Sequence, residues 1–177
     1  MTKITSSQLK KYFKDFSKED AVREILELFQ KFSDVRELYQ SKLSEGGNAE
    51  LCEKYKRIIK DEFFPMRGFG KARLSIARRA VLDFKRISSD IHCVADIMIQ
   101  YVEVGVEFTR EYGDIDEPFY NSMESMYEAA AGFVAEYKIA DMYKARFEKM
   151  VKDTSDIGWG FHDTLSDMYE KHFSKTS

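Results

Sequence analysis

Apolar residues recur at every third or fourth position through most of the chain, which is the spacing of one face of an α-helix. The widest apolar face follows Asp90, where residues 91–112 leave only a narrow polar stripe of Asp96, Gln100, Glu103, Glu107 and Glu111. A helix with so little polar surface packs between neighbours, so we predict that it is the central element. No run of alternating apolar and polar residues predicts a strand, and the predicted fold class is therefore all-α.

Several helix starts are marked by side chains that accept hydrogen bonds from free backbone N–H groups. Ser17 and Asp20 form an acidic variant of a capping box, and Asp116 precedes a helix with Pro118 in its first turn. We predict that residues 1–65 form three or four short helices that cover one end of a helical stack.

The sequence also contains an internal echo. Residues 113–128 read GDIDEPFYNSMESMYE, and 42 positions later residues 156–170 read DIGWGFHDTLSDMYE. The Asp, Ile, Phe, Met, Tyr and Glu positions of the two copies are identical without a gap. Such a period is typical of stacked helical pairs.

A period of about 42 residues falls in the range of HEAT and armadillo proteins, which stack helical hairpins into an α-solenoid. We therefore predict one all-helical domain over residues 1–177. Its parts are N-terminal helices at 1–65 and a repeat region at 72–177, with units at 72–113, 114–155 and a truncated 156–177.

The two echo motifs resemble those of a bacterial protein family that is catalogued only as a domain of unknown function. The resemblance extends along most of the chain and includes the Lys- and Arg-rich loop before the helix that contains Ala77. It implies no activity, substrate or cofactor. Function must therefore be argued from the residues themselves.

Composition narrows the classes of protein that fit. The chain is 44% hydrophobic and 33% charged, and its Lys-rich N-terminus lacks the apolar region of a secretory signal. The most apolar segment carries Asp96 and Glu103 and does not suit a membrane span, so we expect a cytoplasmic protein without a membrane partner. Cys52 and Cys93 have no metal-ligand spacing, and we expect them to be buried free thiols.

Charge is distributed unevenly along the chain. Residues 54–86 contain 11 Lys and Arg against 3 Asp and Glu, whereas residues 87–141 contain 2 basic and 12 acidic residues. The candidate anion-binding residues are Arg67, Lys71, Arg73, Arg78 and Arg79. Two glycines in this loop would let the backbone approach a phosphate. The favoured interpretation is a solvated or internally neutralised basic face, and nucleic acid is possible but not favoured, since Phe69 is the one aromatic residue there.

A candidate polar cluster comes from the two echo copies: Asp114, Asp116, Asn121, Trp159, His162 and Asp163. A His flanked by carboxylates is suited to metal binding or general-base chemistry. The favoured interpretation is capping and hydrogen bonding between helices, with His162 bonded to Asn121, Asp114 or Asp116. No HExxH or Glu-x-x-His spacing occurs, so we assign no metal ligand, catalytic residue or cofactor. Trp159, between two glycines, is interpreted as a structural wedge, with ligand stacking as the alternative.

The favoured hypothesis is a non-enzymatic helical-repeat interaction module that presents a charged groove to a protein or an anionic partner. One alternative is a metal- or small-ligand-binding enzyme that uses the cluster of His162 and Asp163. A further alternative is a weak nucleic-acid or phosphate binder that uses the basic segment at 67–86.

Overall fold

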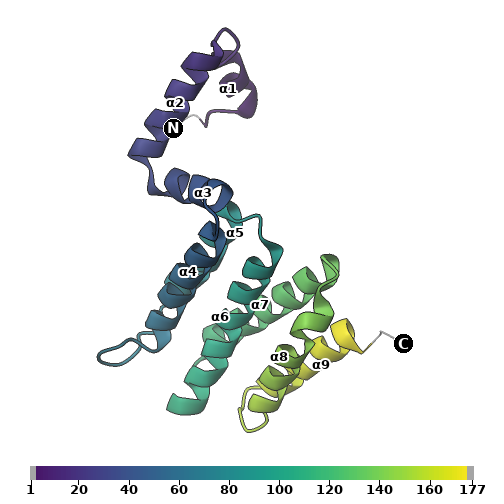
Figure 1. Cartoon of the computed structure of the whole chain (residues 1–177). Coiled ribbons are helices and arrows are strands. Elements are labelled where there is room, and N and C mark those ends of the chain that lie inside the picture. The colour runs from purple at the N-terminus through teal and green to yellow at the C-terminus, as the bar shows by residue number, and fades with distance from the viewer. Residues whose placement is uncertain (1–2, 175–177) are drawn as a thin grey trace.

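The computed structural model describes residues 3–174, and within that range the chain forms nine α-helices and no strand (Figure 1). The predicted all-α fold class is confirmed. In chain order the helices are α1 (Ser6–Tyr12), α2 (Lys18–Lys31), α3 (Ser33–Leu43), α4 (Gly47–Phe63), α5 (Leu74–Ile87), α6 (Ile91–Tyr112), α7 (Glu117–Glu136), α8 (Ala140–Asp153) and α9 (Phe161–Phe173).

Side-chain caps are present at Ser17, Asp90 and Asp116. The Ser17 hydroxyl accepts a hydrogen bond from the Asp20 N–H at 3.1 Å, and the Asp20 carboxylate accepts one from the Ser17 N–H at 3.2 Å. Asp90 accepts from two N–H groups at the start of α6. Asp116 accepts from the Phe119 N–H at 2.9 Å, with Pro118 in the first turn of α7. Each cap satisfies donors that the helix itself leaves free.

The connection between α4 and α5 depends on one glycine. A Cβ at Gly70 would lie 1.7 Å from the carbonyl oxygen of Phe63, so no other residue fits without a backbone shift. The chain returns to α4 at this point, where the Ala72 N–H donates to the Glu62 carbonyl at 2.7 Å. The loop therefore closes tightly against the end of α4.

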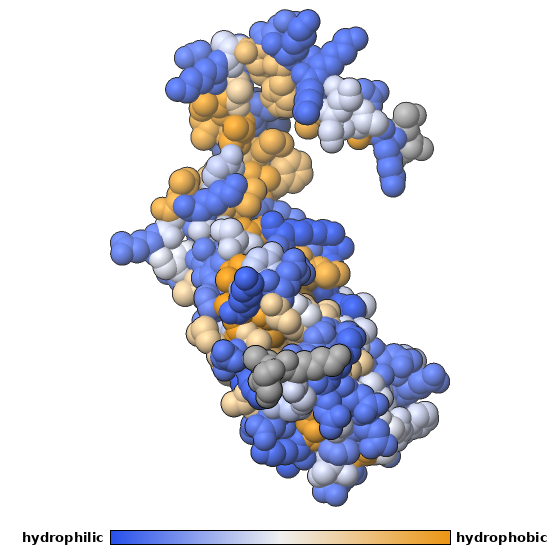
Figure 2. All heavy atoms as spheres, turned by 90° about the vertical axis from the view of Figure 1, so that its right-hand side faces the viewer, coloured by the Kyte–Doolittle hydropathy of each residue, from blue (hydrophilic) through white to orange (hydrophobic). Residues whose placement is uncertain are grey.

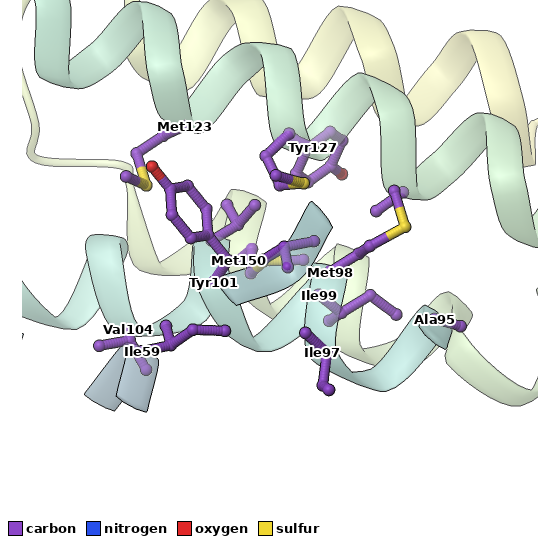
Figure 3. Packing of buried hydrophobic residues seen from close by; sticks show 14 of the residues in the cluster. Ile59, Ala95, Ile97, Met98, Ile99, Tyr101, Val104, Met123, Tyr127 and Met150 are labelled. Carbon is purple, nitrogen blue, oxygen red and sulfur yellow. The ribbon is translucent and has the colours of Figure 1, made fainter. Parts of the chain in front are cut away.

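Helix α6 is the centre of the molecule, as its apolar circumference predicts. It packs against α4, α5, α7 and α8. Figure 3 shows Met98 and Tyr101 of α6 beside Met123 and Tyr127 of α7. A Cβ at Gly105 would lie 2.1 Å from the sulfur of Met123, so α6 and α7 approach each other closely at that glycine.

The C-terminal helices extend the same core. Tyr127 of α7 and Phe147 of α8 meet edge to face with ring centroids 5.0 Å apart, and Phe147 lies 4.9 Å from Phe173 of α9. Edge-to-face and offset rings are the favourable arrangements of aromatic pairs. We refer to α3–α9 as the body.

Helices α1 and α2 behave differently, and with their flanking residues 3–32 we call them the arm. The arm projects from one end of the body (Figure 1), and neither of its helices contains a buried residue. All the N-terminal helices were expected to cover one end of a stack, but only α3 and α4 pack against later helices, whereas α1 and α2 project away from them. The apolar residues of α2 recur at helical spacing, but most of them face solvent.

Two further details differ from the sequence pattern. Met142 and Tyr112 follow the inward spacing of their helices, yet both side chains are exposed. Met142 lies in the first turn of α8 and Tyr112 is the last residue of α6. At helix ends the neighbouring helices no longer cover the apolar face.

Among the described helices, none combines the length and the hydropathy that a bilayer crossing requires.

Candidate functional site

The most extensive charged constellation joins α6 to α8 and includes a residue that the sequence had not singled out. The Arg146 guanidinium donates to both oxygens of Glu103, at 2.7 and 2.6 Å, and also to Asp96. Lys56 of α4 forms an ion pair with the other oxygen of Asp96. Three helices are thus tied together by one network, and the paired guanidinium–carboxylate geometry is the strongest kind of ion pair.

The network changes the acidity of its members. Burial alone would raise the pKa of Asp96, but hydrogen bonds from Lys56 and Arg146 outweigh it and hold that pKa below its ordinary value. Burial acts to lower the pKa of Arg146, and the hydrogen bonds to Glu103 and Asp96 raise it instead. Asp96 and Arg146 are therefore both charged at neutral pH.

A groove runs along this face between α6 and α8. It encloses about 460 Å³ and is lined by Glu103, Val106, Glu107, Arg110, Arg146, Lys149, Met150 and Asp153. A second hollow of about 320 Å³ shares Arg110 and Asp153 with it and continues to Asp114 and Asp156. We call the first of these, the 460 Å³ hollow, the α6–α8 groove.

Charges of opposite sign alternate within the α6–α8 groove. Arg110 lies 3.3 Å from Asp153, which also pairs with Lys149. Glu107 is exposed, and it has no ion pair within residues 3–174. The groove is therefore a mixed-charge surface with one unpaired carboxylate.

The polar cluster predicted from the echo is only partly assembled. The Tyr120 hydroxyl donates to Asp114 at 3.2 Å, and the Tyr120 ring stacks on Trp159 with centroids 6.3 Å apart. A Cβ at Gly158 would lie 3.3 Å from the Asp114 carboxylate. Asp114 and Trp159 are thus brought together through Tyr120, which the sequence had not counted among the cluster.

The other members of the predicted cluster lie apart from this contact. Asp116 caps α7. Asn121 and Asp163 are exposed on α7 and α9. Asp116 therefore has the capping role that was favoured for the cluster as a whole.

His162 faces α8 rather than the start of α7. Its Nδ1 lies 3.0 Å from the Val151 carbonyl and 3.2 Å from the Thr154 hydroxyl, which is fully buried. The expected bond from His162 to Asn121, Asp114 or Asp116 is not formed, so that detail was wrong. Among residues 3–174, no three His, Cys, Asp or Glu side chains converge as metal ligands.

The basic segment is largely engaged by its own chain. Arg73 donates to both oxygens of Glu62 at 2.8 Å, and Arg79 donates to both oxygens of Asp83 at 2.8 Å. Arg78 reaches across to α7, where it donates to the Ser125 hydroxyl at 2.8 Å. Arg67 and Lys71 remain exposed on the loop. The five candidate side chains therefore do not converge on one anion position.

A family model described as "Family of unknown function (DUF6155)" matches residues 4–173. The chain belongs to this family. The resemblance inferred from the two echo motifs, to a family without an assigned function, is thereby confirmed. No curated protein and no solved structure matches the chain.

In this DUF6155 chain, the signal for the α6–α8 groove was present in the sequence but incomplete. The polar stripe of α6 contains Asp96, Glu103 and Glu107, which predicts a charged edge on an otherwise apolar helix. The missing information was which basic helix lies opposite. Arg146 and Lys149 are separated from that stripe by α7, and a single sequence does not give the packing of α8 on α6.

Proposed function

We propose that this chain is a non-enzymatic interaction module that binds a polypeptide segment carrying both positive and negative side chains in the α6–α8 groove. The observation that carries the proposal is the lining of that groove. Three acidic side chains (Glu103, Glu107 and Asp153) and three basic ones (Arg110, Arg146 and Lys149) share about 460 Å³.

The lining favours a peptide over other classes of ligand. Pockets for small molecules are mostly apolar with a few polar groups, whereas only Val106 and Met150 are apolar here. Nucleic acid and other polyanions require an excess of positive charge, and the charges of the groove sum to zero. Mixed charges instead give specificity for a complementary charge pattern.

The proposal retains the helical-repeat architecture. Phe119 and Phe161 occupy equivalent echo positions and are both buried, as are Met123 and Leu165. Helix α7 packs against α9, and α6 packs against α8, which agrees with a stack of hairpins displaced by one unit. Extended grooves along one side of such a stack are where these proteins bind their partners.

A photo-activatable side chain placed at Glu107 tests the proposal, with Glu136 at the exposed end of α7 as the matched position. We expect a protein adduct in cells from position 107 and none from position 136. Equal labelling at both positions, or none at 107, would contradict the groove as a binding site.

Charge reversal then tests the chemistry with the purified adduct partner. Arg110→Glu with Lys149→Glu should weaken binding by about tenfold or more in calorimetry, because like charges would face the partner's acidic groups. Arg57→Glu with Lys60→Glu on α4 changes the net charge equally at exposed positions outside the groove. Comparable losses in both variants would mean that only net charge matters.

A further inference from the structure

The arm concentrates exposed apolar side chains. Of the eighteen large apolar residues that are exposed in the described chain, nine lie in residues 3–32. They are Ile4, Leu9, Tyr12, Val22, Ile25, Leu26, Leu28, Phe29 and Phe32. Figure 2 shows this apolar surface on the arm and at its junction with the body, while much of the visible body surface is hydrophilic. Exposed apolar patches of this kind mark association surfaces.

The face on α2 is too wide for one helix to cover. Val22, Ile25, Phe29 and Phe32 follow the spacing of a two-helix seam, and Leu26 and Leu28 extend it on either side. A wide face of this kind is typical of a helix that meets more than one neighbour. Within its own chain α2 meets α3 only at one end, where the Phe29 and Tyr39 rings are 6.2 Å apart.

Helix α1 does not complete the packing of α2. Leu9 and Tyr12 of α1 are themselves half exposed, at 51% and 55%. The two helices also leave a hollow of about 480 Å³, lined mainly by charged residues. A 14-residue helix with tertiary packing at only one end is marginally stable in water, so the arm requires a partner.

We infer that the arm is the association surface for a second copy of this chain, with the two α2 helices antiparallel and each α1 covering the flank of the other α2. Another arm supplies what the wide face needs, namely a second apolar helical hairpin. The arm also stands clear of the body, so two copies can approach without their bodies meeting (Figure 1).

Charge supports the antiparallel orientation. The first turn of α2 carries Glu19 and Asp20, and its last turn carries Lys31. Antiparallel packing brings each acidic first turn near the basic last turn of the other copy, and the two helix dipoles are then opposed. The body offers no comparable apolar face, since its exposed apolar residues are scattered over the loops and several helices. The arm therefore pairs with another arm rather than with a body.

Sedimentation velocity of the full chain over a concentration series tests this inference. The wild type should sediment as a dimer, and Leu26→Glu with Phe29→Glu should raise the dimer dissociation constant by about tenfold or more, since carboxylates would enter an apolar interface. The matched control is Leu82→Glu with Met142→Glu, which places the same charges at exposed apolar positions of the body. A wild type that stays monomeric into the submillimolar range, or an arm variant that stays dimeric, overturns the inference.

Cross-linking tests the symmetry. In a two-fold dimer the residue nearest the symmetry axis faces the same residue of the other copy. Ile25 lies midway along the apolar face, between Val22 and Phe29. Ile25→Cys should form a covalent dimer under mild oxidation, whereas Leu82→Cys on α5 should not. Equal cross-linking of the two variants would show random collision and would overturn the antiparallel arrangement.

Discussion

Helices α2 and α5 are each 14 residues long and amphipathic, but α5 buries four side chains and α2 buries none. Helix α5 lies against α4 and α6, so its apolar face becomes part of the core. Helix α2 has the stronger start, a complete capping box, whereas α5 begins without a side-chain cap. The strength of a helix's own N-terminal cap therefore does not decide whether the helix is packed in the core. An apolar stripe predicts that a face needs a partner, and the partner need not belong to the same chain.

The contrast extends to charge. In the body, Arg146 joins two carboxylates on α6 and keeps less than a third of its side chain exposed. In the arm, Arg23 pairs with Asp20 one turn away on the same helix, and 70% of its side chain is exposed. The first pair fixes one helix against another, whereas the second contributes little to stability because water screens it. Substitutions at matched positions of the body and the arm should therefore differ in their effect on stability. Unfolding is followed at protein concentrations low enough for the chain to be monomeric.

The largest contrast is expected for Phe84→Ala and Phe29→Ala. Phe84 is fully buried in α5, and its removal should lower the free energy of unfolding by about 3–5 kcal/mol through lost burial and a residual cavity. Phe29 is partly exposed in α2, and its removal should cost less than about 1 kcal/mol. Urea unfolding followed by circular dichroism measures both. Similar losses would show that α2 is packed on the body in solution.

Arg146→Met should be the next largest effect. Removal of the guanidinium leaves Asp96 with Lys56 alone and Glu103 without its bidentate partner, which should cost about 2–3 kcal/mol after allowance for partial exposure. Arg23→Met removes an exposed pair within one helix and should cost less than about 0.5 kcal/mol. The same urea titrations compare the two. Equal and small losses would mean that the network does not hold α8 to α6.

The same network predicts a dependence of stability on pH. The pKa of Asp96 is lowered from its ordinary value of 3.8, so its contribution is complete above that value and is lost as pH falls through the lower, folded pKa. The wild type should therefore lose stability in this acid range more steeply than Asp96→Asn. Urea midpoints measured at a series of pH values give the two slopes.

The arm carboxylate Asp20 also has a lowered pKa, set first by its hydrogen bond from the Ser17 hydroxyl. Asp20→Asn should leave the acid dependence of global unfolding unchanged, because we expect the arm to open before the body.

The features that the sequence predicts are those determined by residues close together in the chain. The central position of α6 follows from its own circumference, and the caps at Ser17 and Asp116 follow from residues within one turn. Such features depend on local chemistry that a single stretch contains. They were predicted correctly for that reason.

Features that depend on two distant elements were not predictable in the same way. His162 binds the end of α8 rather than the start of α7, and Arg146 meets α6 across the intervening α7. The exposure of the α2 stripe is a case of the same kind, since nothing in the stripe itself says which surface covers it. Contacts between elements are determined by packing, which a single sequence does not reveal.

The smallest contrast, and the sharpest test of the boundary between arm and body, is between two helix caps. Asp116→Ala removes an acceptor from the first turn of α7, a core helix, and should lower the free energy of global unfolding by about 1 kcal/mol. Ser17→Ala removes an equivalent cap from α2 and costs that helix a similar amount. If the arm opens before the body, this loss leaves the urea midpoint unchanged and appears only as faster amide hydrogen exchange in α2. Exchange measured peptide by peptide, together with urea unfolding, separates the two outcomes. A fall in global stability after Ser17→Ala as large as that after Asp116→Ala would mean that α2 unfolds together with α7, and that arm and body are one cooperative unit.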